Sequence, residues 1–288
     1  MKAITAFTNF RSASLRHAFP CSATDCIEFV VHLVNKGFAP SIVTTYMSAI
    51  SYMHKCTNLP DPTSDFLVKK TLIGARNLLG EPDKRKPFSL NSLHDIVSAL
   101  DRINISTFER EKYKAMFVTM FYGLIRIGEV TIHRKSDNNK VLQLDDVTFY
   151  HKQRLSSMII EFRQFKHSDP TSSASIKLVA INTEHCPVNR LYNYIAIRGQ
   201  QQGPLFTNEN GAPVTSSQFS SVFNSCLKIR GLDKNTYKPH CFRFGGATYY
   251  AQLGMNDDLL QRFGRWKSQA YKKYIRNPCF DYLKYITD

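Results

Sequence analysis

The spacing of apolar residues changes twice along this 288-residue chain, and these changes limit the folds it can adopt. From residue 22 to residue 124, apolar side chains recur mostly every three or four positions, as they do in amphipathic helices. Between residues 141 and 182 lie three short runs of alternating or β-branched residues, which predict a three-stranded antiparallel sheet. Helical spacing returns from residue 189. We therefore expect a mainly α-helical protein with a small antiparallel β-sheet.

Capping residues before apolar stretches and glycines after them indicate where several helices begin and end. In the first 80 residues, helices are expected at 22–37, 40–55 and 64–80, where they would form a small all-α bundle. In the remainder, helices are expected at 89–102, 109–124, 189–199, 216–231, 240–254, 257–266 and 268–276.

A basic segment with two prolines, EPDKRKPFS, separates these two groups of helices. Prolines among charged residues are typical of a linker. Its three consecutive basic residues could follow a phosphate backbone or could simply be solvated at a hinge: Lys84, Arg85 and Lys86. The chain is therefore divided into a helical domain, a basic linker and a larger α+β domain, at residues 1–81, 82–88 and 89–288.

The net charge favours a polyanionic partner. Thirty-eight Lys and Arg against 23 Asp and Glu give a formal charge of +15. Nucleic acid is the first candidate for such a partner and an anionic membrane surface the second. No run of 18 apolar residues occurs, so no membrane-spanning helix is expected. Because many basic proteins bind no DNA, charge alone does not decide the function.

The cysteines and the N-terminus indicate an intracellular protein. Seven cysteines are scattered without a C-x-x-C pair, so neither a zinc ribbon nor a disulfide framework is expected. The N-terminal residues lack the apolar core of a secretory signal. We expect reduced thiols and no bound metal or other cofactor.

Basic residues that could bind a phosphate occur in three separate segments. YGLIRIGEV places Arg126 and Glu129 three residues apart at a predicted helix start. FRQFKHSDP carries Lys166 at the end of a predicted strand. KPHCFRFGGATYY places His240 and Arg243 on one face of a helix. Taken singly, each also fits an ordinary surface ion pair or a core helix.

The fourth segment, FGRWKSQAYKKYIR, adds an aromatic element and two tyrosines near the C-terminus. The order of the four parts resembles that of the tyrosine recombinases, and the resemblance spans the whole chain. Residues 238–277 carry most of it: GRWKSQAYKKYIRN is similar to the recombinases of DIRS- and Ngaro-type retrotransposons, and YIRN resembles the ending in the phage recombinase Cre. The resemblance implies an N-terminal core-binding bundle followed by a catalytic domain.

The resemblance also implies a reaction. A site-specific recombinase or integrase of a mobile element would cut DNA through a 3′-phosphotyrosyl intermediate and rejoin it, without metal or ATP. Arg126 and Arg243 would clamp the phosphate, since guanidiniums donate planar forks of hydrogen bonds. His240 would accept or orient the phenolic proton, and Lys166 would protonate the departing 5′ oxygen.

The nucleophile is expected to be Tyr274 rather than Tyr271, because Tyr274 precedes Ile-Arg and follows Gly264 by the ten residues of the family pattern. The pattern places histidine directly after that glycine, where this chain has Arg265 followed by Trp266. Trp266 could donate to a phosphate oxygen, or Arg265 could supply a third guanidinium; the sequence leaves both open. Glu129 is expected to orient a neighbouring basic group.

The implied partner is double-stranded DNA, bound by a homotetramer on paired sites; no membrane or small-molecule substrate is expected. Action in the nucleus is expected if the host is a eukaryote, and in the cytoplasm otherwise. The first domain offers five candidate DNA contacts: Lys36, Lys55, Lys69, Lys70 and Arg76. Three other functions stay open: a type IB topoisomerase-like enzyme, a non-catalytic DNA-binding protein derived from such an element, and a basic helical protein with no nucleic-acid role.

Overall fold

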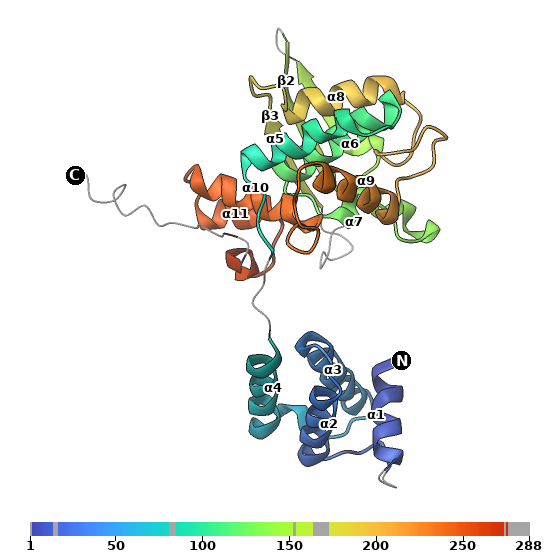
Figure 1. Cartoon of the computed structure of the whole chain (residues 1–288), viewed down its shortest axis with the longest axis vertical. Coiled ribbons are helices and arrows are strands. Elements are labelled where there is room, and N and C mark those ends of the chain that lie inside the picture. The colour runs from blue at the N-terminus through green and yellow to red at the C-terminus, as the bar shows by residue number, and fades with distance from the viewer. Residues whose placement is uncertain are drawn as a thin grey trace, which may run out of the picture. The chain divides into compact units, whose positions relative to one another are not determined.

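The computed structural model describes residues 2–13, 17–80, 85–151, 154–163, 173–273 and 275. The chain divides into two compact units, residues 1–83 and residues 84–288 (Figure 1). Each unit has its own hydrophobic core.

The first unit is a bundle of helices whose bounds are α1 Lys2–Ser12, α2 Ala23–Asn35, α3 Pro40–Cys56 and α4 Phe66–Leu79, with a 3-10 turn at Pro62–Ser64. Local signals set most of these boundaries. Ser22 and Asp25 form a capping box at the start of α2. Pro40 occupies the first turn of α3, and the Asp65 side chain accepts from two amides at the start of α4.

Helix α1 has no counterpart among the expected helices, and tertiary contacts hold it in place. Phe7 is fully buried, with its ring centroid 5.0 Å from that of Phe29. Arg11, at the end of α1, forms a buried ion pair with Asp25. These contacts join α1 to α2 in the core of the bundle.

The second unit contains the helices α5 Leu90–Ala99, α6 Thr107–Tyr122, α7 Ile127–Val130, α8 Pro187–Arg198, α9 Ser216–Ile229, α10 His240–Gln252 and α11 Asp257–Phe263. Short 3-10 turns lie at Leu100–Arg102, Lys135–Lys140, Leu144–Asp146 and Gln269–Lys273. Every residue of α6 from Lys112 to Tyr122 is buried, so α6 forms the centre of this core. The sequence predicted a helix at 268–276, but the described part of that segment is the 3-10 turn.

The sheet has three antiparallel strands in sequence order, β1 Val147–His151, β2 Leu155–Phe162 and β3 Ala174–Val179 (Figure 1). Ile160 of β2 lies opposite Val147 of β1 and Ile176 of β3. Along β3, buried residues alternate with exposed ones, as in a sheet with one solvated face. The predicted fold, mainly helical with a small antiparallel sheet, is therefore confirmed.

The segment after the unit boundary is packed onto the second unit. The amide of Lys86 donates to the carbonyl of Thr236 over 3.3 Å, and that of Phe88 donates to the carbonyl of Cys241 over 3.3 Å. Phe88 is buried, with its ring 5.0 Å from that of Tyr237. Residues 85–88, which the sequence assigned to the linker, are thus anchored to the larger unit. Lys84 lies outside the described residues.

Within the described ranges, no helix is long and apolar enough to cross a membrane. The same residues include no cluster of three or more His, Cys, Asp or Glu side chains arranged to hold a metal ion. The six cysteines that the structure describes are free thiols.

Candidate active site

Two glycines bring α10 into close contact with its neighbours. A Cβ atom on Gly246 would lie 2.0 Å from the carbonyl oxygen of Phe121, at the end of α6. A Cβ atom on Gly245 would lie 2.3 Å from the carbonyl oxygen of Phe88. Because only glycine fits at such distances, the sequence FGG places the second turn of α10 beside the chain that leaves α6.

The carbonyl of Leu124 joins two of the arginines that sequence analysis selected. Leu124 has a φ of 48°, in the left-handed region, where the chain turns from α6 towards α7. Its oxygen accepts a hydrogen bond from Arg243 and another, of 3.1 Å, from Nη2 of Arg265. Arg243 also donates to the carbonyl of Gly264 and is fully buried. Residues more than 100 positions apart in the sequence therefore meet at one carbonyl.

The Glu129 carboxylate lies between two guanidiniums. Its Oε1 is 2.9 Å from Nη1 of Arg126, and its Oε2 is 3.0 Å from Nη2 of Arg265. Oε2 also accepts from the backbone amide of Arg126 over 2.8 Å, which caps the start of α7. Burial alone would raise the pKa of Glu129, but the charges of Arg265, Arg126 and Arg243 outweigh that effect and lower it. Glu129 is therefore ionised and neutralises part of this arginine cluster.

Arg265 and Trp266 follow Gly264 and point to different partners. Arg265 has a φ of 56° and a buried side chain, whose guanidinium carbon lies 3.6 Å from the centroid of the Phe162 ring. The Trp266 ring instead lies against Arg243, 4.2 Å from its guanidinium carbon. A Cβ atom on Gly264 would clash with the Trp266 ring, so the glycine is required for this turn.

Tyr271 is a core residue. It is 2% exposed, its ring centroid is 6.0 Å from that of Trp266, and both belong to a small cluster with Leu124 and Leu260. Burial, then the hydrogen bond to Asp257, raises the pKa of the Tyr271 hydroxyl. A phenol in this setting ionises less readily than one in water.

His240 is the first residue of α10, one helical turn before Arg243. Its ring lies 4.6 Å from that of Phe244, and the Arg85 guanidinium lies 5.3 Å from the same Phe244 ring. His240 is partly exposed, whereas Arg243 faces the interior. The imidazole of His240 and the guanidinium of Arg243 therefore both lie in the first turn of α10.

The structure brings together five of the predicted site residues around the turn after α6: Arg126, Glu129, Arg243, Arg265 and Trp266. His240 joins them through its place on α10. Lys166 and Tyr274 lie outside the described residues, so the predictions for both stay predictions.

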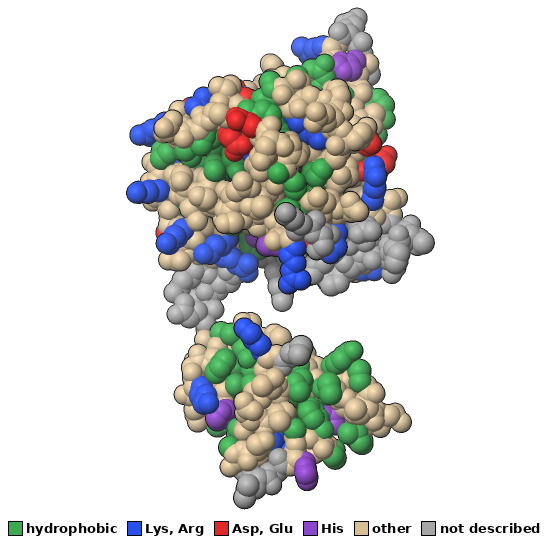
Figure 2. Space-filling model, turned by 90° about the vertical axis from the view of Figure 1, so that its right-hand side faces the viewer, with side chains coloured by type: hydrophobic (Ala, Val, Ile, Leu, Met, Phe, Trp, Pro, Cys, Tyr) green, Lys and Arg blue, Asp and Glu red, His purple; other side chains and the backbone are tan. Residues whose placement is uncertain are grey.

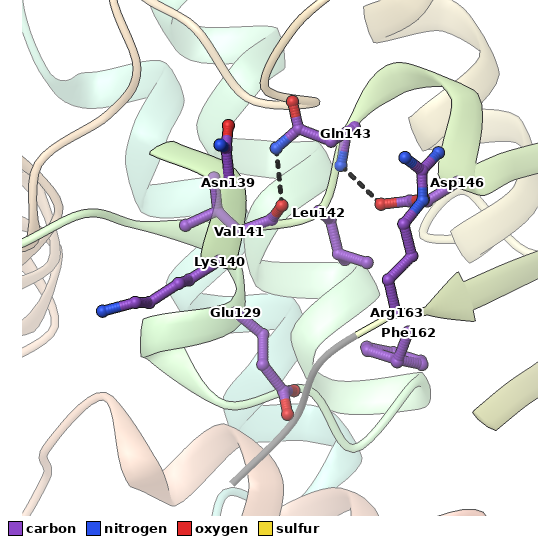
Figure 3. A pocket seen from close by; sticks show the side chains of 9 residues that line it. All are labelled: Glu129, Asn139, Lys140, Val141, Leu142, Gln143, Asp146, Phe162 and Arg163. Carbon is purple, nitrogen blue, oxygen red and sulfur yellow. Dashed lines mark hydrogen bonds and ion pairs between the residues drawn. The ribbon is translucent and has the colours of Figure 1, made fainter. Parts of the chain in front are cut away.

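Glu129 also lines a pocket of about 180 Å³, which lies between the segment 139–146 and the end of β2 (Figure 3). Arg163 reaches from β2 towards Asp146, with 2.6 Å between Nε and Oδ1. The sequence indicates neither residue as part of a site, because an aspartate beside a turn and an arginine after a strand are common surface features. Phe162, which covers Arg265, also carries no signal of that role in the sequence.

The candidate DNA contacts of the first unit are all exposed: Lys36, Lys55, Lys69, Lys70 and Arg76. Lys55 lies 3.4 Å from Asp61, and Lys70 lies 5.3 Å from the Phe66 ring. In the second unit, Lys86 is exposed and Arg85 is half-buried. Figure 2 shows basic side chains spread over the visible surface, with acidic ones gathered in a few places.

No protein-family model matches the chain, and no curated protein matches it. Solved structures do. The XerH site-specific recombinase bound to palindromic difH substrate matches with a TM-score of 0.64 and 13% identity, over 95% of this chain and 73% of that one. The Tn1549 transposon integrase in complex with transposon right end DNA matches with a TM-score of 0.62 and 15% identity, over 92% and 84%. A lambda integrase dimer bound to a COC′ core site gives 0.56 and 13%, over 91% and 67%. The chain therefore has the fold of the tyrosine recombinases.

Proposed function

We propose that this protein is a site-specific DNA recombinase or integrase that cuts and rejoins double-stranded DNA through a tyrosine. The observation that carries the proposal is the meeting of Arg126, Arg243 and Trp266 around one turn, in a chain with this fold. The structures that it resembles include a recombinase bound to its DNA substrate and an integrase bound to transposon DNA. The charge of +15 suits the same partner.

The arginines suit a phosphodiester undergoing substitution. Its transition state spreads negative charge over the non-bridging oxygens, and preorganised donors stabilise that charge without reorganisation. Arg126 is held by Glu129 through Nη1, and its Nη2 makes a 3.3 Å bond to the carbonyl of Arg265. Arg243 is fixed by the carbonyls of Leu124 and Gly264 and by the Trp266 ring. Fixed guanidiniums are what such a site needs.

In the reaction we propose, the Tyr274 oxygen attacks the phosphorus and the bond to the 5′ oxygen breaks. His240 takes the phenolic proton, and Lys166 gives a proton to the departing 5′ oxygen. The 3′-phosphotyrosyl bond keeps the energy of the broken linkage for religation, so the cycle consumes no ATP and asks for no metal ion. Burial and the raised pKa of Tyr271 support Tyr274 as the nucleophile.

The wider setting follows from the same proposal. Residues 1–81 would bind DNA as a core-binding domain, and residues 89–288 would hold the catalytic site. Four subunits would pair two DNA sites and exchange strands between them. The resemblance of residues 264–277 to retrotransposon recombinases supports a mobile element as the source. The enzyme would then act in the nucleus of a eukaryotic host, or in the cytoplasm of a bacterial one.

The test is covalent capture on a suicide substrate. The full-length protein is incubated with a pool of nicked duplexes whose central segment is randomised. After cleavage beside the nick, the short strand that carries the 5′ hydroxyl dissociates and religation is prevented. SDS-stable protein–DNA adducts are isolated and their DNA is sequenced to identify the site. We expect adducts from the wild type and none from Tyr274→Phe.

Adducts that persist in Tyr274→Phe and vanish in Tyr271→Phe would move the nucleophile. If the wild type yields no adduct from the pool, the proposed function is wrong. Relaxation of supercoiled plasmid by a monomer, without exchange between two sites, would favour the topoisomerase activity instead.

A further inference from the structure

We propose that Arg265 is a positioning residue, which holds Glu129 and through it aims Arg126, and that it does not bind the phosphate itself. This inference rests on the proposed function. It concerns the position after Gly264, where the sequence left open whether Arg265 supplies a third guanidinium or Trp266 donates to a phosphate oxygen.

The guanidinium of Arg265 is directed into the protein. Its side chain is 2% exposed. Nη2 donates to Glu129 over 3.0 Å and to the Leu124 carbonyl over 3.1 Å. Nη1 lies 3.3 Å from the carbonyl oxygen of Phe263. Both terminal nitrogens therefore have acceptors inside the fold.

One face of that guanidinium is also covered. Phe162, the last residue of β2, places its ring centroid 3.6 Å from the guanidinium carbon. The Nε atom is buried as well. Burial and a ring contact do not by themselves set Arg265 apart, because Arg243 is as buried, donates to two carbonyls and lies against Trp266. What assigns Arg265 to an internal role is its ion pair with the Glu129 carboxylate, 3.0 Å away.

Glu129 transmits the effect of Arg265 to Arg126. Oε2 of Glu129 is taken by Arg265 and by the Arg126 amide, so the Arg126 side chain engages only Oε1. The Nη2 atom of Arg126 donates to the backbone carbonyl of Arg265 over 3.3 Å, so Arg265 also contacts Arg126 directly. Without Arg265, a buried carboxylate would draw Arg126 into a two-pronged ion pair. Arg126 would then be turned away from the DNA.

The decisive experiment is a double-mutant cycle between Arg265 and Glu129. It uses the full-length protein and the same nicked duplex pool, and measures the single-turnover rate of adduct formation together with the Kd for DNA. We expect Arg265→Gln to slow adduct formation about tenfold, from the coupling usual for contacting residues, while the Kd changes by less than about twofold. Adding Glu129→Gln to Arg265→Gln should then raise the rate of adduct formation at least about threefold, because Arg126 is no longer held in an ion pair with Glu129.

A second variant keeps the proposal testable if Arg265→Gln does not fold. Arg265→Lys keeps a positive charge beside Glu129, so the adduct rate should stay within about fivefold of the wild type. A direct phosphate ligand would lose about a hundredfold or more on losing its fork. The control is Arg230→Gln, which removes an arginine at the end of α9 that forms an ion pair of 3.2 Å with Asp95 of α5. Its adduct rate should equal that of the wild type.

Two results would overturn the inference. One is a rate for Glu129→Gln/Arg265→Gln that is no higher than that of Arg265→Gln. The other is a hundredfold loss in Arg265→Lys with an unchanged unfolding midpoint. Either result, with adducts from the wild type, would leave the proposed function standing, and the second would assign Arg265 to the DNA. Absence of adducts from the wild type would remove the proposed function and this inference with it.

Discussion

The guanidinium of Arg243 lies over the ring of Trp266, with 4.2 Å between its central carbon and the ring centroid. Arg243 is 1% exposed and Trp266 is 9% exposed, so this cation–π contact is largely removed from water. A desolvated contact of this kind is worth about 2 kcal/mol. Hydrogen bonds to the carbonyls of Leu124 and Gly264 fix the same guanidinium from its edge. Ring and carbonyls together leave Arg243 one orientation.

Trp266→Ala should destabilise the second unit by about 3–5 kcal/mol, because it leaves a cavity where a buried ring supported Arg243. Trp266→Phe keeps a ring over the guanidinium and should cost less than half as much. Urea unfolding of the full chain, followed by circular dichroism, measures both. Equal losses for the two variants would show that ring size, and not the contact with Arg243, sets the cost.

Gly246→Ala should destabilise the protein strongly, since the new Cβ would lie 2.0 Å from the Phe121 carbonyl oxygen and 2.5 Å from Cδ2 of Leu124. Separating α10 from α6 also moves Arg243, so we expect a loss above about 2 kcal/mol together with loss of adducts. Gly128→Ala is the control: it is helical, with no atom within 4 Å of the new Cβ, and should be neutral or stabilise by up to about 1 kcal/mol. A mild effect at Gly246 would contradict the close approach.

Stability should fall in mild acid because of a histidine pair between α5 and the loop before α8. The rings of His94 and His185 are 4.5 Å apart. Burial, then the neighbouring His94, lowers the pKa of His185 from its usual 6.5. The unfolded chain therefore binds a proton more readily than the folded one, so the free energy of unfolding decreases as the pH falls below about 6.5.

The measurement for this pair is the urea midpoint at a pH of about 7.5 and of about 5.5. His185→Gln should reduce the difference between the two midpoints. His133→Gln, at an exposed histidine, should leave it as in the wild type. A pH dependence that survives in His185→Gln would assign the effect to other groups.

The logarithm of the DNA association constant should fall linearly with the logarithm of salt concentration, and α4 should account for part of the slope. Lys69, Lys70 and Arg76 all lie exposed on α4. If Lys69 contacts a phosphate, Lys69→Ala should reduce the slope by about 1, since one fewer counterion is released. Fluorescence anisotropy with labelled duplex DNA measures it. Lys2→Ala, on α1, is the control that removes the same charge elsewhere. An equal change in the salt slope for Lys2→Ala would show that the slope depends on net charge and not on a contact of Lys69.

The sequence predicts those elements whose signals are local. Ser22 with Asp25, and Thr215 with Gln218, form the capping boxes that mark the starts of α2 and α9. The alternation of Ile176 and Leu178 with exposed residues marks β3. Helix α1 was not among the helices expected from the sequence, and the packing of Phe7 holds it in the folded bundle.

The candidate site is predictable as a set of residues but not as a set of contacts. Spacing pointed to Arg126 with Glu129, and to His240 with Arg243, because each pair lies within one helical turn. The inward direction of Arg265 depends on its positive φ and on a carboxylate 136 residues away. Contacts over such separations follow from the packing of whole helices, which a single sequence does not encode in any short pattern.

The acceptor shared by Arg243 and Arg265 belongs to the main chain at Leu124, so no change of side chain there can alter its chemistry. What that position contributes is the direction of a peptide plane, set by a backbone angle that β-branched residues adopt at a cost. An aliphatic exchange such as Leu124→Val would therefore misdirect two cations while every charged group stays in the sequence. A comparison of polar residues alone would not reveal the loss of function in such a variant.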